Sequence, residues 1–212
     1  MQFGYRLPGN PYRKRETRIL VIGGYVGMKE IRWHGRGGNG GFTAARLLGS
    51  AAALHSGKYG QAFPSFGPER RGAPVLGFTR ISDEPITDHS QVYECDCVIV
   101  LDATLMDAVN VLDGLKEDGC LVINTAEPEE VIRKRPGFDA VKNLVLLDGT
   151  SLALKELGTD IVNTVMLGAA IGATDLVTLD AINAAVDDTM SPALREKNKK
   201  VIKMAYDAVK EG

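Results

Sequence analysis

The sequence predicts a single α/β domain of three layers, α/β/α, with helices on both faces of a mainly parallel, mixed sheet. A strand, a glycine turn and a helix follow one another directly in residues 31–46. Apolar runs typical of buried parallel strands recur at residues 96–102, 120–125 and 143–148, with helical segments between them, as in βαβ units. With 212 residues and 44% hydrophobic content, the chain can form one sizeable core.

The first 27 residues differ from the rest of the chain. They carry five basic residues against one acidic residue, and Pro8 and Pro11 interrupt their first half. The apolar patch at residues 19–22 is too short for a signal sequence. We expect a basic N-terminal extension over residues 1–27 that is not necessarily native, because Met28 directly precedes the regular unit and is an alternative start.

The glycine turn follows the spacing G-x-G-x-x-G at Gly35, Gly37 and Gly40. This spacing lets the backbone turn sharply and point a helix N-terminus at an anion, and it makes the predicted fold Rossmann-like. The helix after the turn is predicted over residues 41–55. A nicotinamide site would need an acidic residue about 20 positions further on, and residues 55–60 contain none. The turn therefore binds a phosphate of another ligand, or its glycines only permit tight packing of the strand against the helix.

A loop dense in glycine, proline and aromatic residues is predicted over residues 59–72, and long ordered loops are often functional. It ends with Glu69, Arg70 and Arg71, while Arg36 lies inside the glycine turn. Guanidinium groups bind phosphate or carboxylate in a planar, bidentate manner. The alternative for each arginine is a structural ion pair that holds the loop in place.

The remaining elements follow from period and capping residues. A strand is predicted over residues 73–81, where Pro74 is tolerated only at the start or at a sheet edge. Helices are predicted at residues 105–115, 128–133, 150–157, 163–173, 178–188 and 192–209. The apolar run at residues 166–173 is far shorter than the ~20 residues of a membrane-spanning helix and predicts a buried one.

Charge and cysteine usage exclude several functional classes. The net charge of −2 argues against nucleic acid or an anionic membrane as the main partner. The three cysteines, Cys95, Cys97 and Cys120, have no second ligand pair at metal spacing and suit free thiols in a reducing cytoplasm. No iron–sulfur cysteine run is present. His34, at the strand end before the turn, could reach a ligand, although a structural role is the alternative.

Two separated motifs together resemble one family. G-R-G-G-N-G at residues 35–40 and Q-A-F-P-S-F-G-P-E-R-R-G-A-P-V at residues 61–75 resemble the gamma component of the 2-oxoacid:ferredoxin oxidoreductases, those acting on pyruvate especially. The resemblance continues through residues 80–86 and 98–105, and covers residues 28–212 as one gamma-type domain. Asn39 stands where the family usually has Gln, which keeps an amide with a shorter reach.

The resemblance implies a subunit that is inactive alone. The family oxidatively decarboxylates a 2-oxoacid with coenzyme A to acyl-CoA and carbon dioxide, and reduces ferredoxin. Thiamine diphosphate and iron–sulfur clusters would reside on alpha, beta and delta-type partner chains, so this chain is expected to bind no cofactor by itself and to have no catalytic or metal-ligating residue. Its expected contacts, toward partners and coenzyme A, are Gly35, Arg36, Gly37, Gly38, Asn39, Gly40, Glu69, Arg70 and Arg71.

Two alternatives stay open at this point. The wording E-R-R-G-A-P-V favours pyruvate by analogy, but relatives acting on 2-oxoisovalerate look similar. The glycine turn is also compatible with a free-standing nucleotide-binding protein.

Overall fold

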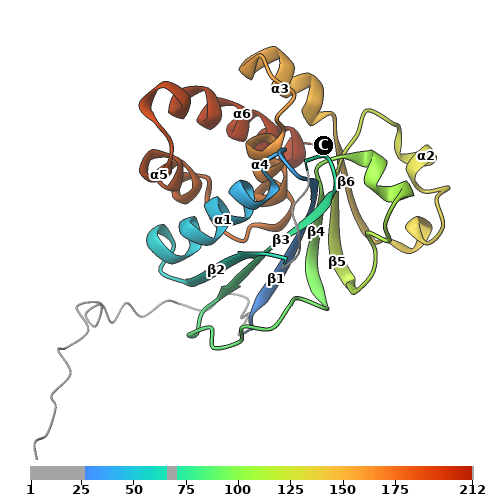
Figure 1. Ribbon diagram of the computed structural model, residues 1–212, viewed down its shortest axis with the longest axis horizontal. Coiled ribbons are helices and arrows are strands. Elements are labelled where there is room, and N and C mark those ends of the chain that lie inside the picture. The colour runs from blue at the N-terminus through green and yellow to red at the C-terminus, as the bar shows by residue number, and fades with distance from the viewer. Residues whose placement is uncertain (1–26, 66–70, 212) are drawn as a thin grey trace, which may run out of the picture.

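The computed structural model describes residues 27–65 and 71–211, and this part of the chain holds one mixed sheet in the order β2-β3-β1-β4-β5-β6 (Figure 1). The strands are β1 (Lys29–Arg36), β2 (Tyr59–Pro64), β3 (Pro74–Ser82), β4 (Cys95–Val100), β5 (Leu115–Asn124) and β6 (Asn143–Leu147). β1, β4, β5 and β6 are parallel, whereas β3 is antiparallel to β1 and to β2. The predicted α/β class with a mainly parallel, mixed sheet is confirmed.

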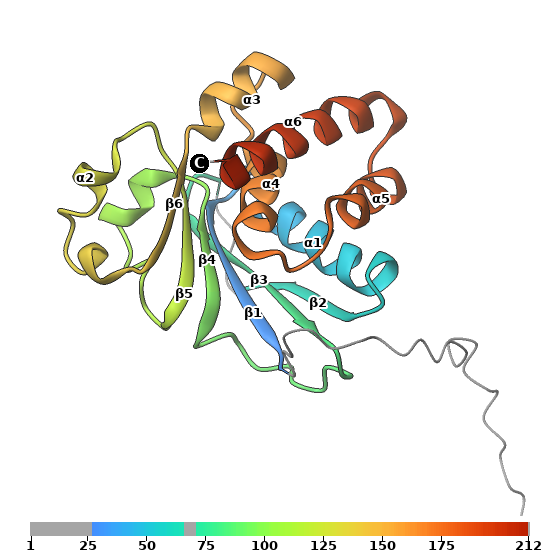
Figure 2. The same ribbon diagram turned by 180° about the vertical axis from the view of Figure 1, so that it is seen from behind.

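The two outer layers differ in thickness. The α-helices are α1 (Gly41–His55), α2 (Glu129–Ile132), α3 (Gly149–Leu157), α4 (Asn163–Thr174), α5 (Leu179–Thr189) and α6 (Pro192–Glu211). α1 and α3–α6 pack on one face, and both views show them gathered there (Figures 1 and 2). The other face is covered by α2 and two short 3-10 helices, η1 (Ala103–Asp107) and η2 (Phe138–Ala140).

The core on the helical face includes polar groups that hydrogen bond to one another. Trp33 of β1 is fully buried, and its indole N–H donates to the Thr79 hydroxyl at 3.1 Å. Thr79 in turn donates to the Ala45 carbonyl of α1 at 2.9 Å. This chain of bonds joins β1, β3 and α1 without leaving a buried donor unsatisfied. α4 is buried over residues 164–172, as its small apolar residues predicted.

The prediction of a loop over residues 59–72 is wrong for its first six residues, because Tyr59–Pro64 forms the edge strand β2. This strand pairs with β3 along its whole length and lies against α1. A Cβ on Gly60 would lie 2.1 Å from the Gly49 carbonyl oxygen of α1, so only glycine permits this approach. Small residues replace large apolar ones on the buried side, and this removes the alternation that usually marks a strand.

The helix predicted over residues 105–115 is also wrong: a 3-10 turn is followed by irregular chain, and β5 starts at Leu115. The buried Arg32 guanidinium donates to the carbonyls of Val111, at 3.2 Å, and of Asp113. Asn110 adds a local turn by accepting from the Leu112 N–H at 3.1 Å. Tertiary contacts therefore use the backbone groups that a helix would need.

Most other boundaries match within two residues, and α1 matches at both ends. β5 is the exception, since it begins five residues before the predicted Cys120 with the polar stretch 116–118. The connections from β4 to β5 and from β5 to β6 contain only the short α2 and 3-10 turns. Of the longer helices that cover the sheet, α1 lies between β1 and β2, and α3–α6 follow β6. None of the described helices combines the length and apolar character required to span a membrane. The predicted extension, apart from Gly27, lies outside the described residues.

Candidate functional site

The carboxyl ends of the parallel strands open into a cavity of about 910 Å³. After β1 the chain passes through α1 to β2 and β3 on one side of β1, and then crosses to β4 on the other side. Open parallel sheets bind ligands at such a switch point, outside the carboxyl ends of the strands. The lining includes Gly37, Gly38, Asn39, Arg71, Asp102 and Asn124.

The glycine turn forms the wall nearest α1. Asn39 accepts from the Arg36 N–H through its side chain at 2.7 Å, and its own N–H donates to the Arg36 carbonyl at 3.1 Å. Gly38 and Gly40 have positive φ angles of 102° and 72°. A Cβ on Gly40 would lie 2.4 Å from the Asn163 side-chain nitrogen, so the turn is closed against α4. These contacts fix the loop that the sequence pattern predicted.

Three helices begin around this cavity. No side chain caps the start of α1, whereas Asp148 caps α3 by accepting from the Ser151 N–H at 2.9 Å. Thr150 of α3 and Val162, immediately before α4, both line the cavity. Helix N-termini carry a partial positive charge, so their convergence favours an anionic group of a ligand.

Arg36 has a structural role in this arrangement. Its guanidinium donates to the Asp102 carboxylate at 2.5 Å, to the Thr104 hydroxyl at 2.7 Å and to the Gly72 carbonyl at 3.0 Å. These three partners belong to the end of β4, to η1 and to the segment before β3. Arg36 therefore connects the glycine turn to both neighbouring strands. Of the two roles that the sequence allowed for this arginine, the structural ion pair is the one observed.

Asp102 is the anionic partner of Arg36. Burial acts to raise the pKa of its carboxyl, but hydrogen bonds from Thr104 and Arg36 outweigh burial, and the pKa lies below its ordinary value. The Thr104 N–H donates to this carboxylate at 2.9 Å and its hydroxyl at 2.6 Å. Asp102 is thus charged at neutral pH and repels a ligand anion from its side of the cavity.

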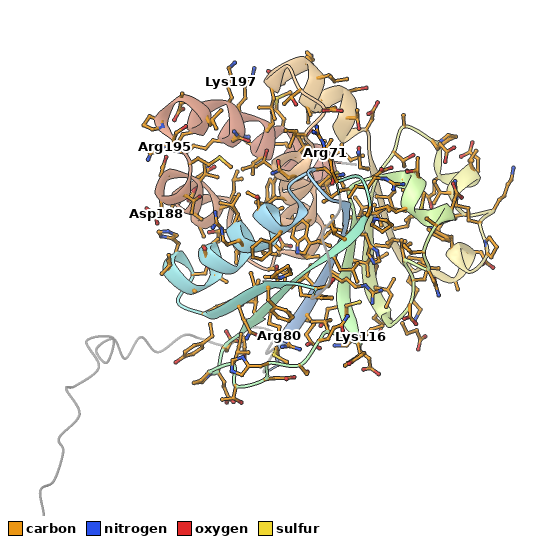
Figure 3. All side chains as sticks on the ribbon, viewed as in Figure 1. Arg71, Arg80, Lys116, Asp188, Arg195 and Lys197 are labelled. Carbon is orange, nitrogen blue, oxygen red and sulfur yellow. The ribbon has the colours of Figure 1, made fainter. Side chains whose placement is uncertain are left out.

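The Arg71 guanidinium takes no part in the contacts that Arg36 makes. Its backbone lies beside Gly37 in an isolated parallel bridge, and the next N–H, that of Gly72, donates to the Gly37 carbonyl at 3.0 Å. The side chain is exposed and lines the cavity beside the start of α1 (Figure 3). Within the described part of the chain, no hydrogen bond or ion pair engages it. Arg71 is therefore positioned to meet an incoming anion.

The other predicted contacts divide into three groups. Gly37, Gly38 and Asn39 line the cavity with Arg71, and their contacts with a ligand or partner stay a prediction. Gly35, Arg36 and Gly40 belong to the turn but do not line the cavity. Glu69 and Arg70 lie outside the described residues, so their predicted contacts stay predictions.

Sequence reasoning missed one amide of the cavity lining, that of Asn124. Asn124 ends β5 and is buried; its side-chain nitrogen donates to the Leu101 carbonyl at 2.9 Å and the Thr150 hydroxyl at 3.0 Å. Its side-chain oxygen accepts from the Thr150 N–H at 3.1 Å. The signal was available, because a polar residue at the carboxyl end of a buried parallel strand points to a binding site. Asp160 was missed too and adds an exposed carboxylate.

His34 is not part of the ligand surface. Only 4% of it is exposed, and its Nε2 accepts from the Arg32 side chain at 3.0 Å on the thinly covered face of the sheet. Burial, and secondarily the Arg32 charge, lower the pKa of His34 to about 3. The structural alternative for this histidine therefore holds, and the described cavity residues supply binding groups.

No group of three or more His, Cys, Asp or Glu residues is placed to hold a metal ion within residues 27–65 and 71–211. The three cysteines are free thiols, as predicted, and the structure adds that all three are buried.

Comparison with known proteins adds to this geometry. The sequence model of the pyruvate ferredoxin/flavodoxin oxidoreductase family matches residues 30–208. The "Pyruvate/ketoisovalerate oxidoreductases common subunit gamma" of Thermococcus kodakarensis is 50% identical over 184 residues, covering 85% of this chain and 96% of the relative. "Pyruvate synthase subunit PorC" of Methanocaldococcus jannaschii is 49% identical over 180 residues, with the same coverage. The crystal structure of the pyruvate oxidoreductase subunit PORC of Thermotoga maritima superimposes with a TM-score of 0.73 at 39% identity, covering 85% of this chain and 96% of that one.

Proposed function

Because this chain belongs to the pyruvate ferredoxin/flavodoxin oxidoreductase family, we propose that it is the gamma subunit of a multisubunit pyruvate:ferredoxin oxidoreductase. The complex would oxidise pyruvate with coenzyme A to acetyl-CoA and carbon dioxide, and pass the electrons to ferredoxin. The observation that carries the proposal is identity near one half along 96% of the length of subunits with that role. Alpha, beta and delta-type chains are the proposed partners, in the cytoplasm, without nucleic acid or membrane.

The reactive cofactors belong to the partner chains in this proposal. A cluster with four cysteine ligands needs one more cysteine than the whole chain has, and the three present are buried. Thiamine diphosphate and the clusters would therefore be held elsewhere in the complex. The contribution of this chain is to bind and orient, at the side from which coenzyme A approaches.

The cavity at the carboxyl ends is the proposed coenzyme A side of the subunit. A phosphate would be placed near Gly38 and Arg71, because the Asp102 and Asp160 carboxylates repel an anion from the rest of the lining. Those carboxylates and the amides would instead accept hydrogen bonds from neutral N–H and O–H groups of the same ligand. Arg71 is the proposed anionic contact, while Arg36 keeps the turn in shape.

A reconstitution experiment tests the assignment. The chain should be co-expressed with its alpha, beta and delta-type partners, and thiamine-dependent, coenzyme A-dependent ferredoxin reduction measured with pyruvate. We expect turnover by the complete complex and none by this chain alone. Full activity of a complex that lacks this chain would contradict the assignment.

A panel of 2-oxoacids in the same assay decides the substrate. The relative from T. kodakarensis is described as common to pyruvate and ketoisovalerate oxidoreductases, which favours 2-oxoisovalerate as the second candidate. The free-standing nucleotide-binding alternative would instead gain from micromolar binding of NAD or a flavin by the isolated chain.

A further inference from the structure

A second cavity, of about 670 Å³, lies at the opposite end of the parallel strands from the glycine turn. Its walls include Cys97 of β4, Cys120 of β5 and three lysines, Lys29, Lys142 and Lys210. Figure 3 labels Arg71 and Lys116 at the two ends of the sheet, and Lys116 pairs with Asp96 of this second cavity at 3.0 Å. The two cavities share no lining residue. The second one is therefore independent of the proposed coenzyme A side.

The two thiols in this cavity lie side by side. Cys97 and Cys120 are register partners on adjacent parallel strands, which are about 4.8 Å apart. Both belong to the core on the helical face, and their side chains hydrogen bond to each other. That bond raises the pKa of Cys97, which burial raises further, and lowers the pKa of Cys120.

Access to the pair comes through the second cavity. Cys120 is 8% exposed and Cys97 only 1%, so an incoming species meets the Cys120 sulfur first. Thiolate character, together with access, determines the reactivity of a cysteine.

The third cysteine is separate. A β-bulge between Cys95 and Cys97 turns Cys95 to the other face of the sheet, where its thiol donates to the Gly114 carbonyl at 3.5 Å. Two of the three thiols therefore form one unit, and Cys95 is a natural control for it.

The charged groups around the pair are already matched. Lys29 pairs with Asp96 at 2.9 Å, Lys142 with Glu117 at 2.7 Å, and Lys210 with Asp175 at 2.7 Å. Lys142 also pairs with Asp118, another wall residue, at 3.0 Å. Paired lysines do not form a dedicated anion site. The two thiols are therefore the candidate ligand groups of this cavity.

Two neighbouring sulfurs select a particular ligand class. Zinc needs three or four protein ligands, and no cluster of three His, Cys, Asp or Glu residues that could hold a metal occurs in residues 27–65 and 71–211. A soft monovalent cation such as Cu⁺ or Ag⁺ is satisfied by two thiolates in near-linear coordination. We propose that Cys97 and Cys120 form a two-thiolate binding site for a soft monovalent metal ion at the amino-terminal end of the sheet.

The binding step is an exchange of protons for the metal, without oxidation or reduction. Both S–H bonds break, two sulfur–metal bonds form, and two protons leave for solvent. One cation and two neutral thiols thus become a complex with one negative charge. The bound ion would join β4 to β5 and stabilise the folded chain by mass action.

Silver ion titration of the purified full chain tests this site. We expect one Ag⁺ per chain by native mass spectrometry, release of two protons, and a higher melting temperature. Cys97→Ser and Cys120→Ser should each weaken Ag⁺ binding at least 100-fold, whereas Cys95→Ser should bind as the unsubstituted chain does. Unchanged affinity in either of the first two variants, or loss of binding in Cys95→Ser, would overturn the proposal.

A labelling experiment keeps the test decisive if a serine variant does not fold. In the unsubstituted chain, bound Ag⁺ should slow iodoacetamide alkylation of Cys120 at least tenfold. Alkylation of Cys120 at the same rate with and without one equivalent of Ag⁺ would refute the site.

Discussion

The two ends of the parallel strands offer opposite chemistry on one sheet. At the carboxyl ends, a glycine turn, three helix starts and Arg71 surround a polar cavity. At the amino ends, two thiols and ion-paired lysines line the second cavity. The first set is suited to an anionic ligand, the second to a soft cation. The difference teaches that position along the strands, rather than the sheet itself, determines what each end can bind.

At the carboxyl ends, the glycine turn packs closely against α4. An added methyl group tests this contact and has the largest expected effect. Gly40→Ala adds a Cβ that meets the Asn163 side chain at 2.4 Å, at a φ of 72°. We expect the free energy of unfolding to fall by about 3 kcal/mol, from strain and overpacking together. Denaturant unfolding measures it.

Gly57→Ala is the matched control for this substitution. Gly57 has a φ of 66° and nothing within 4 Å of an added Cβ, so only the backbone strain of about 1 kcal/mol applies. Equal losses in the two variants would show that the turn is not closed against α4 as described.

Acidification tests how far the carboxyl end depends on a neutral His34. The His34 carbonyl accepts from the Leu101 N–H at 2.8 Å, and Leu101 lines the cavity. The pKa of His34 is about 3 in the folded chain against 6.5 ordinarily, so the unfolded chain binds more protons between these values. Stability is therefore full above pH 6.5 and falls as the pH drops toward 3.

The expected loss from His34 alone between pH 7 and pH 5 is about 2 kcal/mol. His34→Gln keeps an acceptor for Arg32 and should remove this part of the pH dependence, as measured by unfolding at both pH values. The same decline in the variant and in the unsubstituted chain would show that His34 is not the group responsible.

Sequence patterns predicted the parts of the fold whose residues respond to local rules. α1 has both predicted ends, since glycine precedes it and Gly57 follows its last turn. The parallel strands β4, which is mostly buried, and β6, which is partly buried, were found because they are largely apolar runs. β2 was not predicted, because its contact with α1 uses Gly60 and Ala62 in place of large side chains. Arg32 suppressed a helix at residues 105–115 from 79 positions away, and no local rule contains that contact.

The candidate site was predictable in type but not in the division of roles. The glycine spacing located the turn, and two of the arginines that the sequence analysis named, Arg36 and Arg71, lie beside it. Arg36 and Arg71 are equivalent in sequence terms, yet Asp102 and Thr104 engage only the first. That distinction depends on strand order, which brings the end of β4 beside the turn.

Measurement of the apparent KM for coenzyme A in the reconstituted complex tests the central claim most directly. Arg71→Ala should raise this KM about tenfold, equivalent to about 1.4 kcal/mol, with little change in kcat, because one charge-assisted contact to a phosphate is lost. Arg46→Ala, an exposed arginine on α1 outside the cavity lining, should leave the KM unchanged. An unchanged KM in Arg71→Ala would contradict the claim that the cavity at the carboxyl ends faces coenzyme A.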